Sequence, residues 1–453
     1  MKFFIRIALA FVLCTGAGVC HAEYAVAPFQ ADVTAPIGHP MMGGGIAPAA
    51  RIDDNLMAKG IVLLGADKPI VICVFDWCEL RNDAYDYVRA VMARAAQTPL
   101  DHVMLSCIHQ HDAPIADFQA QRLLNAQGLK KALCDVEYIQ DSARRTAEAL
   151  RASLQNPIPV THYGVGEAEV NEVASNRRVV DGEGNVSFPR TSATGDAAIR
   201  SRPIGVMDPW LKMLTFWNGD TAVAAISNYA VHPMSYYGKG GVSKDFTGHA
   251  RERLQAEQPG VFQIYASGCS GDIVAGKYND GSPETRVVLA DKMYQGMVSA
   301  WERQVKHPIQ SLTFRCAKLR LEPRNSEGFS VADSERILKD TNKTIFQRIL
   351  AAMALSWHER VGKDQPIDVP CIDLGRVQYL VMPAESFVEY QLIAQQMSPA
   401  SLVLVAGYGE SAPGYIPTQR ETEEGFNMAH EWLWVAPGVE GSMREAMREA
   451  LGK

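Results

Sequence analysis

The stretch that decides how this chain is organised is Val103-Met-Leu-Ser-Cys-Ile-His-Gln-His-Asp-Ala-Pro114, an apolar run that ends in two histidines. The run 103–108 predicts a buried β-strand, because it is short and apolar, and the proline that follows ends regular structure. His109 and His111 are therefore expected where a strand gives way to a loop. Residues two apart on a strand point the same way, so both imidazoles could reach one point. Such convergence indicates a metal, although the spacing alone also occurs in ordinary loops.

Strand-like and helical segments alternate along the rest of the chain, with an Asn218-Gly219 hairpin signal among them. This alternation predicts an α/β fold of mixed β-sheets flanked by helices. No linker or repeat divides the chain, so we expect a single large domain over residues 23–453. The expected strands are 61–64, 69–75, 103–108, 160–170, 211–217, 221–227, 261–266, 310–321, 371–381 and 402–406. The expected helices are 83–96, 137–154, 245–257, 284–304, 331–360, 385–395 and 441–451, and 171–209 is expected to be a long loop.

The first 22 residues have the composition of a secretory signal peptide. Lys2 and Arg6 supply the positive start, residues 7–13 the apolar centre, and Cys20-His-Ala22 a small-residue cleavage site. We expect cleavage after Ala22 and a periplasmic or secreted protein. No later segment holds about 18 uninterrupted apolar residues, so no transmembrane span is expected. Transient contact with a membrane surface remains open.

Charge and cysteine content exclude some classes of protein. The formal net charge is -7, and loss of Lys2 and Arg6 would take it to -7 - 2 = -9, which argues against nucleic acid as a partner. The sequence has no C-x-x-C pattern, so a zinc ribbon or thioredoxin-type site is not supported. An odd number of cysteines would remain after cleavage, and several lie in apolar runs typical of buried free thiols. They are Cys73, Cys78, Cys107, Cys134, Cys269, Cys316 and Cys371.

Three of the expected strands end in or beside a residue that can bind a metal: His109, His232 and Glu385. Strand ends on one edge of a sheet converge in space, so a His/His/Glu zinc site with an open fourth position is physically reasonable. Each residue also has an ordinary structural interpretation. His232 precedes Pro233 and could be a turn residue, and Glu385 could be an acid at a helix N-terminus.

Short motifs spread over most of the chain favour the metal interpretation. They are Asp32-Val-Thr-Ala-Pro36, Met41-Met-Gly-Gly44, Ile108-His-Gln-His-Asp-Ala-Pro114, Asn176-Arg177, Asn228-Tyr-Ala-Val-His-Pro-Met-Ser235, Gly268-Cys-Ser-Gly-Asp272, Met382-Pro-Ala-Glu385 and Pro413-Gly-Tyr-Ile-Pro-Thr418. In this order the chain resembles the N-terminal catalytic domain of the neutral/alkaline (non-lysosomal) ceramidases. The resemblance implies the fold of that domain and a zinc ion held by His109, His232, Glu385 and Tyr415.

The resemblance also divides the two histidines between different roles. It implies that His111 is not a ligand but the general base for the attacking water, or the group that holds that water. It implies that Arg177 binds the substrate carbonyl oxygen or the developing oxyanion, and that Tyr415 assists. The motif around Arg177 departs from the family pattern, because Arg178 stands where a serine is expected.

Two further departures concern the substrate. Val274 stands where the family carries a serine, so a mechanism that needs that hydroxyl is not available. The chain ends at Lys453, which leaves no sequence for the family's C-terminal immunoglobulin-like domain, and this puts ceramide itself in doubt more than amide hydrolysis.

We therefore expect a zinc-dependent amidohydrolase that cleaves a linear N-acyl amide, either ceramide or a related lipid or small amide. One alternative is a dinuclear metallohydrolase that shares the His109/His111 pair, which a count of two metals per chain would favour. Another is a non-catalytic secreted binding protein with a degenerate site, for which Val274 is the best support. The sequence leaves the oligomeric state undetermined.

Overall fold

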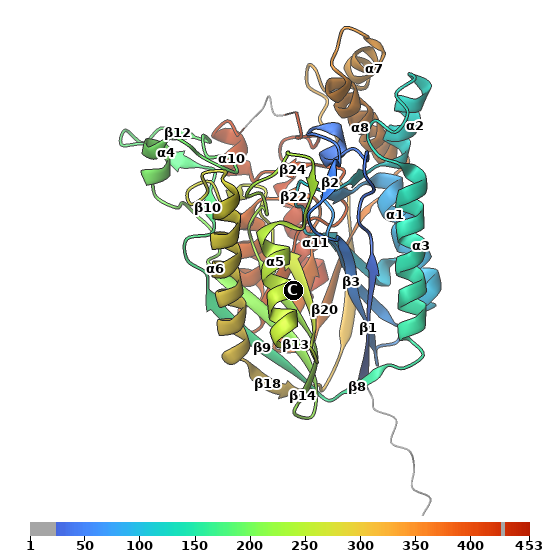
Figure 1. Ribbon diagram of the computed structural model, residues 1–453, viewed down its shortest axis with the longest axis vertical. Helices are drawn as coiled ribbons and strands as arrows, with labels where there is room; N and C mark the ends of the chain where they lie inside the picture. The colour runs from blue at the N-terminus through green and yellow to red at the C-terminus, as the bar shows by residue number, and fades with distance from the viewer. Residues whose placement is uncertain (1–23, 427–430) are drawn as a thin grey trace, which may run out of the picture.

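Figure 1 shows the computed structural model, which describes residues 24–426 and 431–453. The expected signal peptide lies outside the described residues. Three sheets form the body of the molecule, and helices cover their outer faces. The predicted class, an α/β fold with mixed sheets in one large domain, is confirmed.

The first sheet has the strand order β6-β4-β3-β1-β8. Its strands are β6 (Val103–Cys107), β4 (Ile70–Phe75), β3 (Met57–Leu64), β1 (Tyr24–Asp32) and β8 (Ile158–Val160). Only the β4–β6 pair is parallel, and helix α1 (Asn82–Ala96) crosses over between these two strands. Helix α3 (Val136–Ser153) packs against α1 and β1. The apolar run before His109 and His111 thus forms an edge strand of this sheet.

The second sheet has the order β16-β14-β13-β9-β18. Its strands are β16 (Phe262–Ser267), β14 (Thr221–Tyr229), β13 (Trp210–Asn218), β9 (His162–Glu169) and β18 (Val305–Pro308). The hairpin predicted at Asn218-Gly219 joins β13 to β14. β14 and β16 are parallel and are connected through α5 (Asp245–Glu257). This helix and α6 (Pro283–Glu302) cover the outer face of the sheet (Figure 1).

The third sheet has the order β19-β20-β21-β23, built from β19 (Thr313–Leu319), β20 (Ile367–Asp373), β21 (Val377–Val381) and β23 (Leu402–Ala406). Helices α11 (Glu440–Leu451) and α9 (Val388–Met397) pack on it. Residues 371–381, expected to be one strand, instead belong to the β20–β21 hairpin, which turns at Gly375 with φ +91°. Glycine takes this left-handed conformation without a steric penalty.

The sheets enclose two hydrophobic cores. Alternate side chains of β4 enter different cores: Val71, Cys73 and Phe75 pack in one, and Ile70, Ile72 and Val74 pack in the other. Successive side chains on a strand point to opposite faces, so a strand buried on both faces is apolar throughout. This explains why the central runs of the sequence lack alternating polarity.

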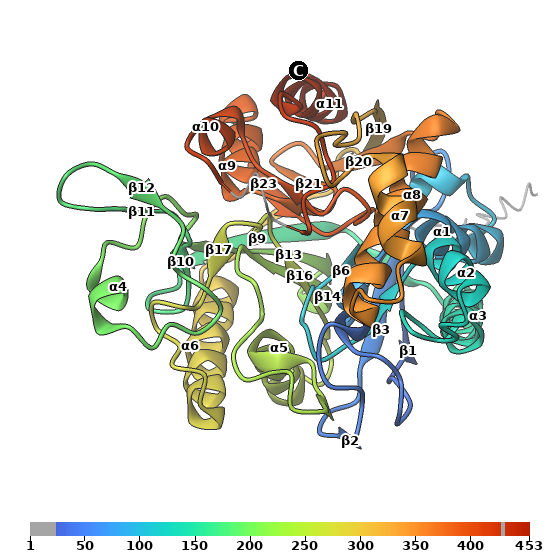
Figure 2. The same ribbon diagram turned by 90° about the horizontal axis from the view of Figure 1, so that it is seen from above.

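Three further sequence expectations about local structure were wrong. The helix expected over 331–360 is two helices, α7 (Val331–Lys339) and α8 (Ile345–Gly362), because Thr344 and Gln347 form a capping box that starts a new helix. The loop expected over 171–209 contains the short strands β10 (Ser175–Asn176), β11 (Val179–Val180) and β12 (Val186–Ser187) and helix α4 (Ala197–Ser201). Figure 2 shows β11, β12 and α4 projecting to the left of the sheets. Glu385 does not begin a helix but lies in strand β22 (Glu385–Ser386).

Candidate active site

The ends of one strand from each sheet bring three metal-binding side chains together. His109 follows β6, His232 follows β14, and Glu385 follows β21. Backbone hydrogen bonds fix each one: His109 N donates to Trp77 O at 3.0 Å, His232 N to Ile273 O at 3.0 Å, and Glu385 N to Gly414 O at 3.0 Å. The site is thus built on rigid elements of all three sheets, whereas the sequence predicted strand ends on one edge of a single sheet.

The two histidines of the opening motif lie close together, but not for the reason expected from the sequence. β6 ends at Cys107, and His109 has φ +64°, so strand alternation does not align the rings. The left-handed backbone at His109 turns its imidazole toward His232, with ring centroids 4.9 Å apart, while the His111 ring lies 5.2 Å from that of His109. A non-glycine residue in this conformation is strained, and such strain often marks functional sites.

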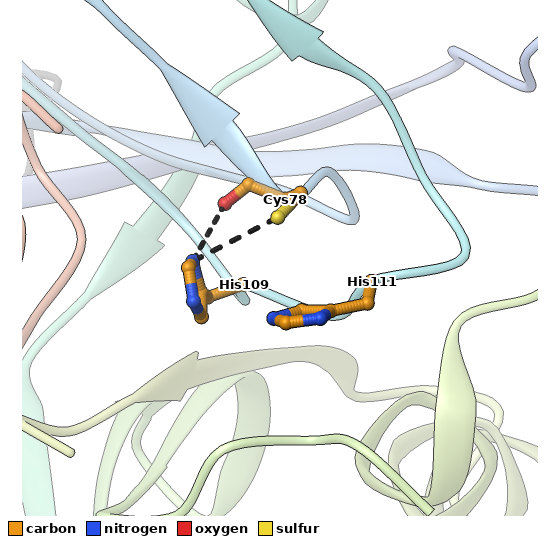
Figure 3. A group of neighbouring side chains, drawn as sticks. All are labelled: Cys78, His109 and His111. Carbon is orange, nitrogen blue, oxygen red and sulfur yellow. Dashed lines mark hydrogen bonds between the residues drawn. The ribbon is translucent and has the colours of Figure 1, made fainter. Parts of the chain in front are cut away.

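Three donor atoms meet at the centre of the site. Glu385 Oε2 lies 2.9 Å from His232 Nε2 and 3.4 Å from His109 Nε2, and all three residues are buried. The opposite ring nitrogens face backbone carbonyls: His109 Nδ1 lies 3.2 Å from Cys78 O (Figure 3), and His232 Nδ1 lies 3.1 Å from Ile273 O. Carbonyls accept only from N–H, so each Nδ1 carries a proton, and each Nε2 faces Glu385 Oε2, where a proton or a metal ion can lie between the two atoms. Metal-binding histidines are held in this way.

These donor atoms fit a zinc ion. Two imidazole lone pairs and a carboxylate oxygen face one another in a buried space, and this arrangement leaves electron-rich atoms together unless a cation lies between them. Nitrogen and oxygen donors of this kind are those of catalytic zinc sites with a fourth position open.

Tyr415 and Arg177 stand beside this centre. Strand β24 (Tyr415–Ile416) pairs in parallel with β22, which places Tyr415 opposite Glu385. Arg177 Nη2 donates to Tyr415 Oη at 3.3 Å, and its Nε donates to Gly271 O at 3.2 Å. Asp272 braces this arrangement, because its carboxylate accepts from Asn176 Nδ2 at 2.6 Å and from Val388 N at 2.8 Å. Arg177, which is half-buried, is therefore held against Tyr415 at the edge of the site.

His111 lines the cavity beside the three donor residues. The cavity holds about 280 Å³ of space, part of it open to solvent, and Met42, Ile115 and Trp432 form its apolar wall. Among the residues that the structure describes, no hydrogen-bond partner faces His111 Nδ1, which is buried. A nitrogen in this state is available to a water molecule or a substrate in the cavity.

Burial and neighbouring charges set the protonation states. Burial alone would raise the pKa of Glu385, but His109 and His232 hold that pKa well below its usual range. Burial lowers the pKa of His232 to about 4. Burial, together with His109 and His232, also holds the pKa of His111 well below its usual value. At neutral pH the site therefore contains a carboxylate and a neutral His111 that can accept a proton.

Residues that the sequence argument did not single out support the first histidine. The Tyr408 ring stacks on His109 at 4.2 Å, and its hydroxyl lies 2.6 Å from Ser270 Oγ. Glu79 Oε1 lies 3.7 Å from His109 Nδ1, while Glu79 Oε2 accepts from Arg81 at 2.8 Å. Cys78 and Glu79 follow β4, and Tyr408 follows β23. A search for polar residues just after strand ends would have found these residues if it had included the ends of β4 and β23.

Residue 274, where the resemblance leads us to expect a serine, is a buried valine. Val274 lies in β17 (Ile273–Val274), opposite Ser175 of β10, and its side chain is completely buried. The seven cysteines discussed above are free, and all except the half-buried Cys316 are buried.

Comparison with known proteins bears on the fold. No known protein family and no curated protein sequence matches the chain. The solved structure of neutral ceramidase from Pseudomonas aeruginosa matches it with a TM-score of 0.67 and 17% sequence identity, over 95% of this chain and 74% of that one. A second structure, of a ceramidase complexed with C2, matches with a TM-score of 0.65 and 16% identity, over 95% of this chain and 75% of that one. The chain therefore has the neutral ceramidase fold, as its motifs predicted. In the described part of the chain, no helix is long and apolar enough to cross a membrane.

Proposed function

We propose that this protein is a zinc-dependent amide hydrolase of ceramidase type, which cleaves a linear N-acyl amide such as ceramide or a related N-acyl lipid. The observation that carries the proposal is the convergence of His109 Nε2, His232 Nε2 and Glu385 Oε2 within 4.8 Å of one another. The neutral ceramidase fold supports the same class of reaction.

In this proposal His109, His232, Glu385 and Tyr415 hold the zinc ion. Zinc, when bound, polarises a carbonyl and lowers the pKa of a coordinated water. The Nδ1 contacts to Cys78 O and Ile273 O keep the two imidazoles in the ligand tautomer. Tyr415 is held beside Glu385 by strand pairing, so its hydroxyl is positioned by the backbone.

The remaining polar residues handle protons and charge. His111 is neutral and has a buried nitrogen without a protein partner among the described residues, so it takes the proton from the attacking water. Arg177 and Tyr415 stabilise the negative charge that develops on the amide oxygen, because charge-assisted donors are strongest where water is excluded. The apolar wall of Met42, Ile115 and Trp432 suits the start of an acyl chain.

The proposal is tested by measuring metal content together with turnover of ceramide, N-acyl amino acids, N-acyl amines and simple esters. With one equivalent of zinc per chain, the wild-type protein is expected to bind the ion and to hydrolyse at least one amide. His109→Ala and Glu385→Ala are expected to lose both properties. Glu389→Ala, on helix α9 outside the cavity, is the matched control. Stoichiometric zinc in either site variant would show that this ligand set is wrong.

The same measurements separate the competing functions. Activity that requires two metals per chain would favour a dinuclear hydrolase, and zinc binding without any turnover would favour a binding protein. Export is a separate part of the proposal: the mature protein, recovered from the periplasm or medium, is expected to begin immediately after Ala22.

A further inference from the structure

A thiol adjoins the proposed zinc ligands on the side away from His232. Cys78 Sγ lies 3.9 Å from His109 Nδ1, and Figure 3 shows Cys78 above the space between the rings of His109 and His111. One ligand atom from each of these three residues lies within 4.8 Å of the other two. Cys78, Glu79 and His111 also line the same cavity.

We propose that Cys78 Sγ and a ring nitrogen of His111 form a second metal position, which takes a thiophilic divalent cation such as Zn²⁺ or Cd²⁺. This position is distinct from the proposed zinc site, since it uses neither His232 nor Glu385. His109 serves the first site through Nε2, and its Nδ1 remains bonded to Cys78 O.

Both donors have capacity that the protein does not use. His111 Nδ1 has no protein partner in the described residues. Glu79 lines the same cavity but pairs through Oε2 with Arg81 at 2.8 Å. Cys78 is free, and a thiolate selects soft cations over Mg²⁺ or Ca²⁺. When an ion binds, the S–H bond breaks, a metal–sulfur bond forms and one proton passes to the solvent.

Occupation of the second position would inhibit the enzyme. It would take His111 away from the attacking water and fill part of a cavity of about 280 Å³. Inhibition rests on the proposed function, but metal binding at Cys78 does not. The two ideas can therefore fail separately.

The test is titration of metal-free protein with Cd²⁺, followed by the ultraviolet charge-transfer absorption of a Cd²⁺–thiolate bond and by equilibrium dialysis. The wild-type protein is expected to bind two equivalents, one of them with the thiolate absorption. Cys78→Ser and Cys78→Ala are expected to lose that absorption and to bind one equivalent. Cys371→Ser removes a buried thiol in the third sheet and is expected to behave as wild type.

Zinc inhibition is the second readout. Activity of the wild-type enzyme with excess Zn²⁺, divided by its activity with stoichiometric Zn²⁺, is expected to fall well below one, and the ratio in Cys78→Ser is expected to stay near one. Thiolate absorption that persists without Cys78, or a wild-type protein that binds one Cd²⁺ without this absorption, would overturn the second position. Loss of activity on every amide would instead count against the proposed function.

Discussion

Glu385 and Tyr415 face each other across a pair of two-residue parallel strands, β22 and β24. The pairing sets the carboxylate and the phenol side by side through the backbone. The strand partner of one proposed ligand is therefore another proposed ligand. The backbone around both residues thus matters for the geometry of the site as much as their side chains do.

Gly414 makes this pairing possible. It has φ +67°, and a Cβ atom at this position would clash with the carbonyl oxygen of Trp432. We expect Gly414→Ala to reduce the free energy of unfolding by more than about 1 kcal/mol. The same change should weaken zinc binding, because Tyr415 would shift. Gly425→Ala is the control, since Gly425 has φ +83° but no atom lies within 4 Å of the added Cβ. Equal zinc affinity in both variants would contradict this role of Gly414.

Arg177→Lys is expected to separate catalysis from metal binding. A lysine cannot reproduce the two contacts that Arg177 makes from Nε and Nη2 to Gly271 O and Tyr415 Oη. We expect kcat to fall by about 10²- to 10³-fold, the usual effect of removing an oxyanion donor. Zinc content should be unchanged. Arg178→Lys is the matched control, because Arg178 pairs with Glu424 at 2.6 Å outside the cavity. Similar losses in both variants would remove Arg177 from the mechanism.

His111→Ala is expected to retain zinc and lose activity. Removal of a general base lowers kcat by about 10²- to 10⁴-fold. His109→Ala should instead lose the metal, although the two rings lie only 5.2 Å apart. Metal analysis and steady-state kinetics on both variants test this division. If His111→Ala also released the first equivalent of zinc, His109 and His111 would both be ligands, and this result would favour the dinuclear alternative.

His39 is expected to make folding stability depend on pH. Burial lowers its pKa from 6.5 to about 4. Its Nδ1 donates to Pro40 O at 2.7 Å, and its Nε2 accepts from Asp135 N at 3.2 Å, so the folded state needs the neutral ring. Between pH 6.5 and about 4 the unfolded chain binds a proton that the folded chain does not. The contribution of His39 to the free energy of unfolding is complete above pH 6.5 and falls by roughly 3 kcal/mol as the pH drops to about 4.

The measurement is denaturant unfolding of wild type and His39→Gln from about pH 7 to about pH 4, a range that spans the unfolded and folded pKa values. The glutamine side chain of the variant cannot titrate, so the difference in unfolding free energy between the two proteins should shrink as the pH falls. Other groups, including the zinc ligands, affect both proteins alike. A pH-independent difference would mean that His39 does not titrate in this range.

Local sequence patterns were sufficient to predict the strand ends that carry His109 and His232, because short apolar runs that end in proline or glycine have few alternative structures. They failed at Glu385, since an acidic residue before a helical pattern resembles a helix N-terminus. Only the partner strand at residue 415, distant in sequence, makes it β. The position of Arg177 depends on contacts with residues 271 and 272 and on β10–β17 pairing, which no local pattern encodes. The separation of β20 from β21 was missed, although Asp373 and Gly375 are residue types that favour turns.

The dispersion of the proposed ligands over all three sheets bears on how the protein is made. Small zinc modules gather their ligands from one short segment, so metal binding can drive their folding. Here the first ligand is residue 109 and the last is residue 415, and β22 cannot pair with β24 until residue 415 has left the ribosome. The complete set of proposed ligands therefore exists only after strands from all three sheets have come together, so in this proposal metal loading is a late step of folding.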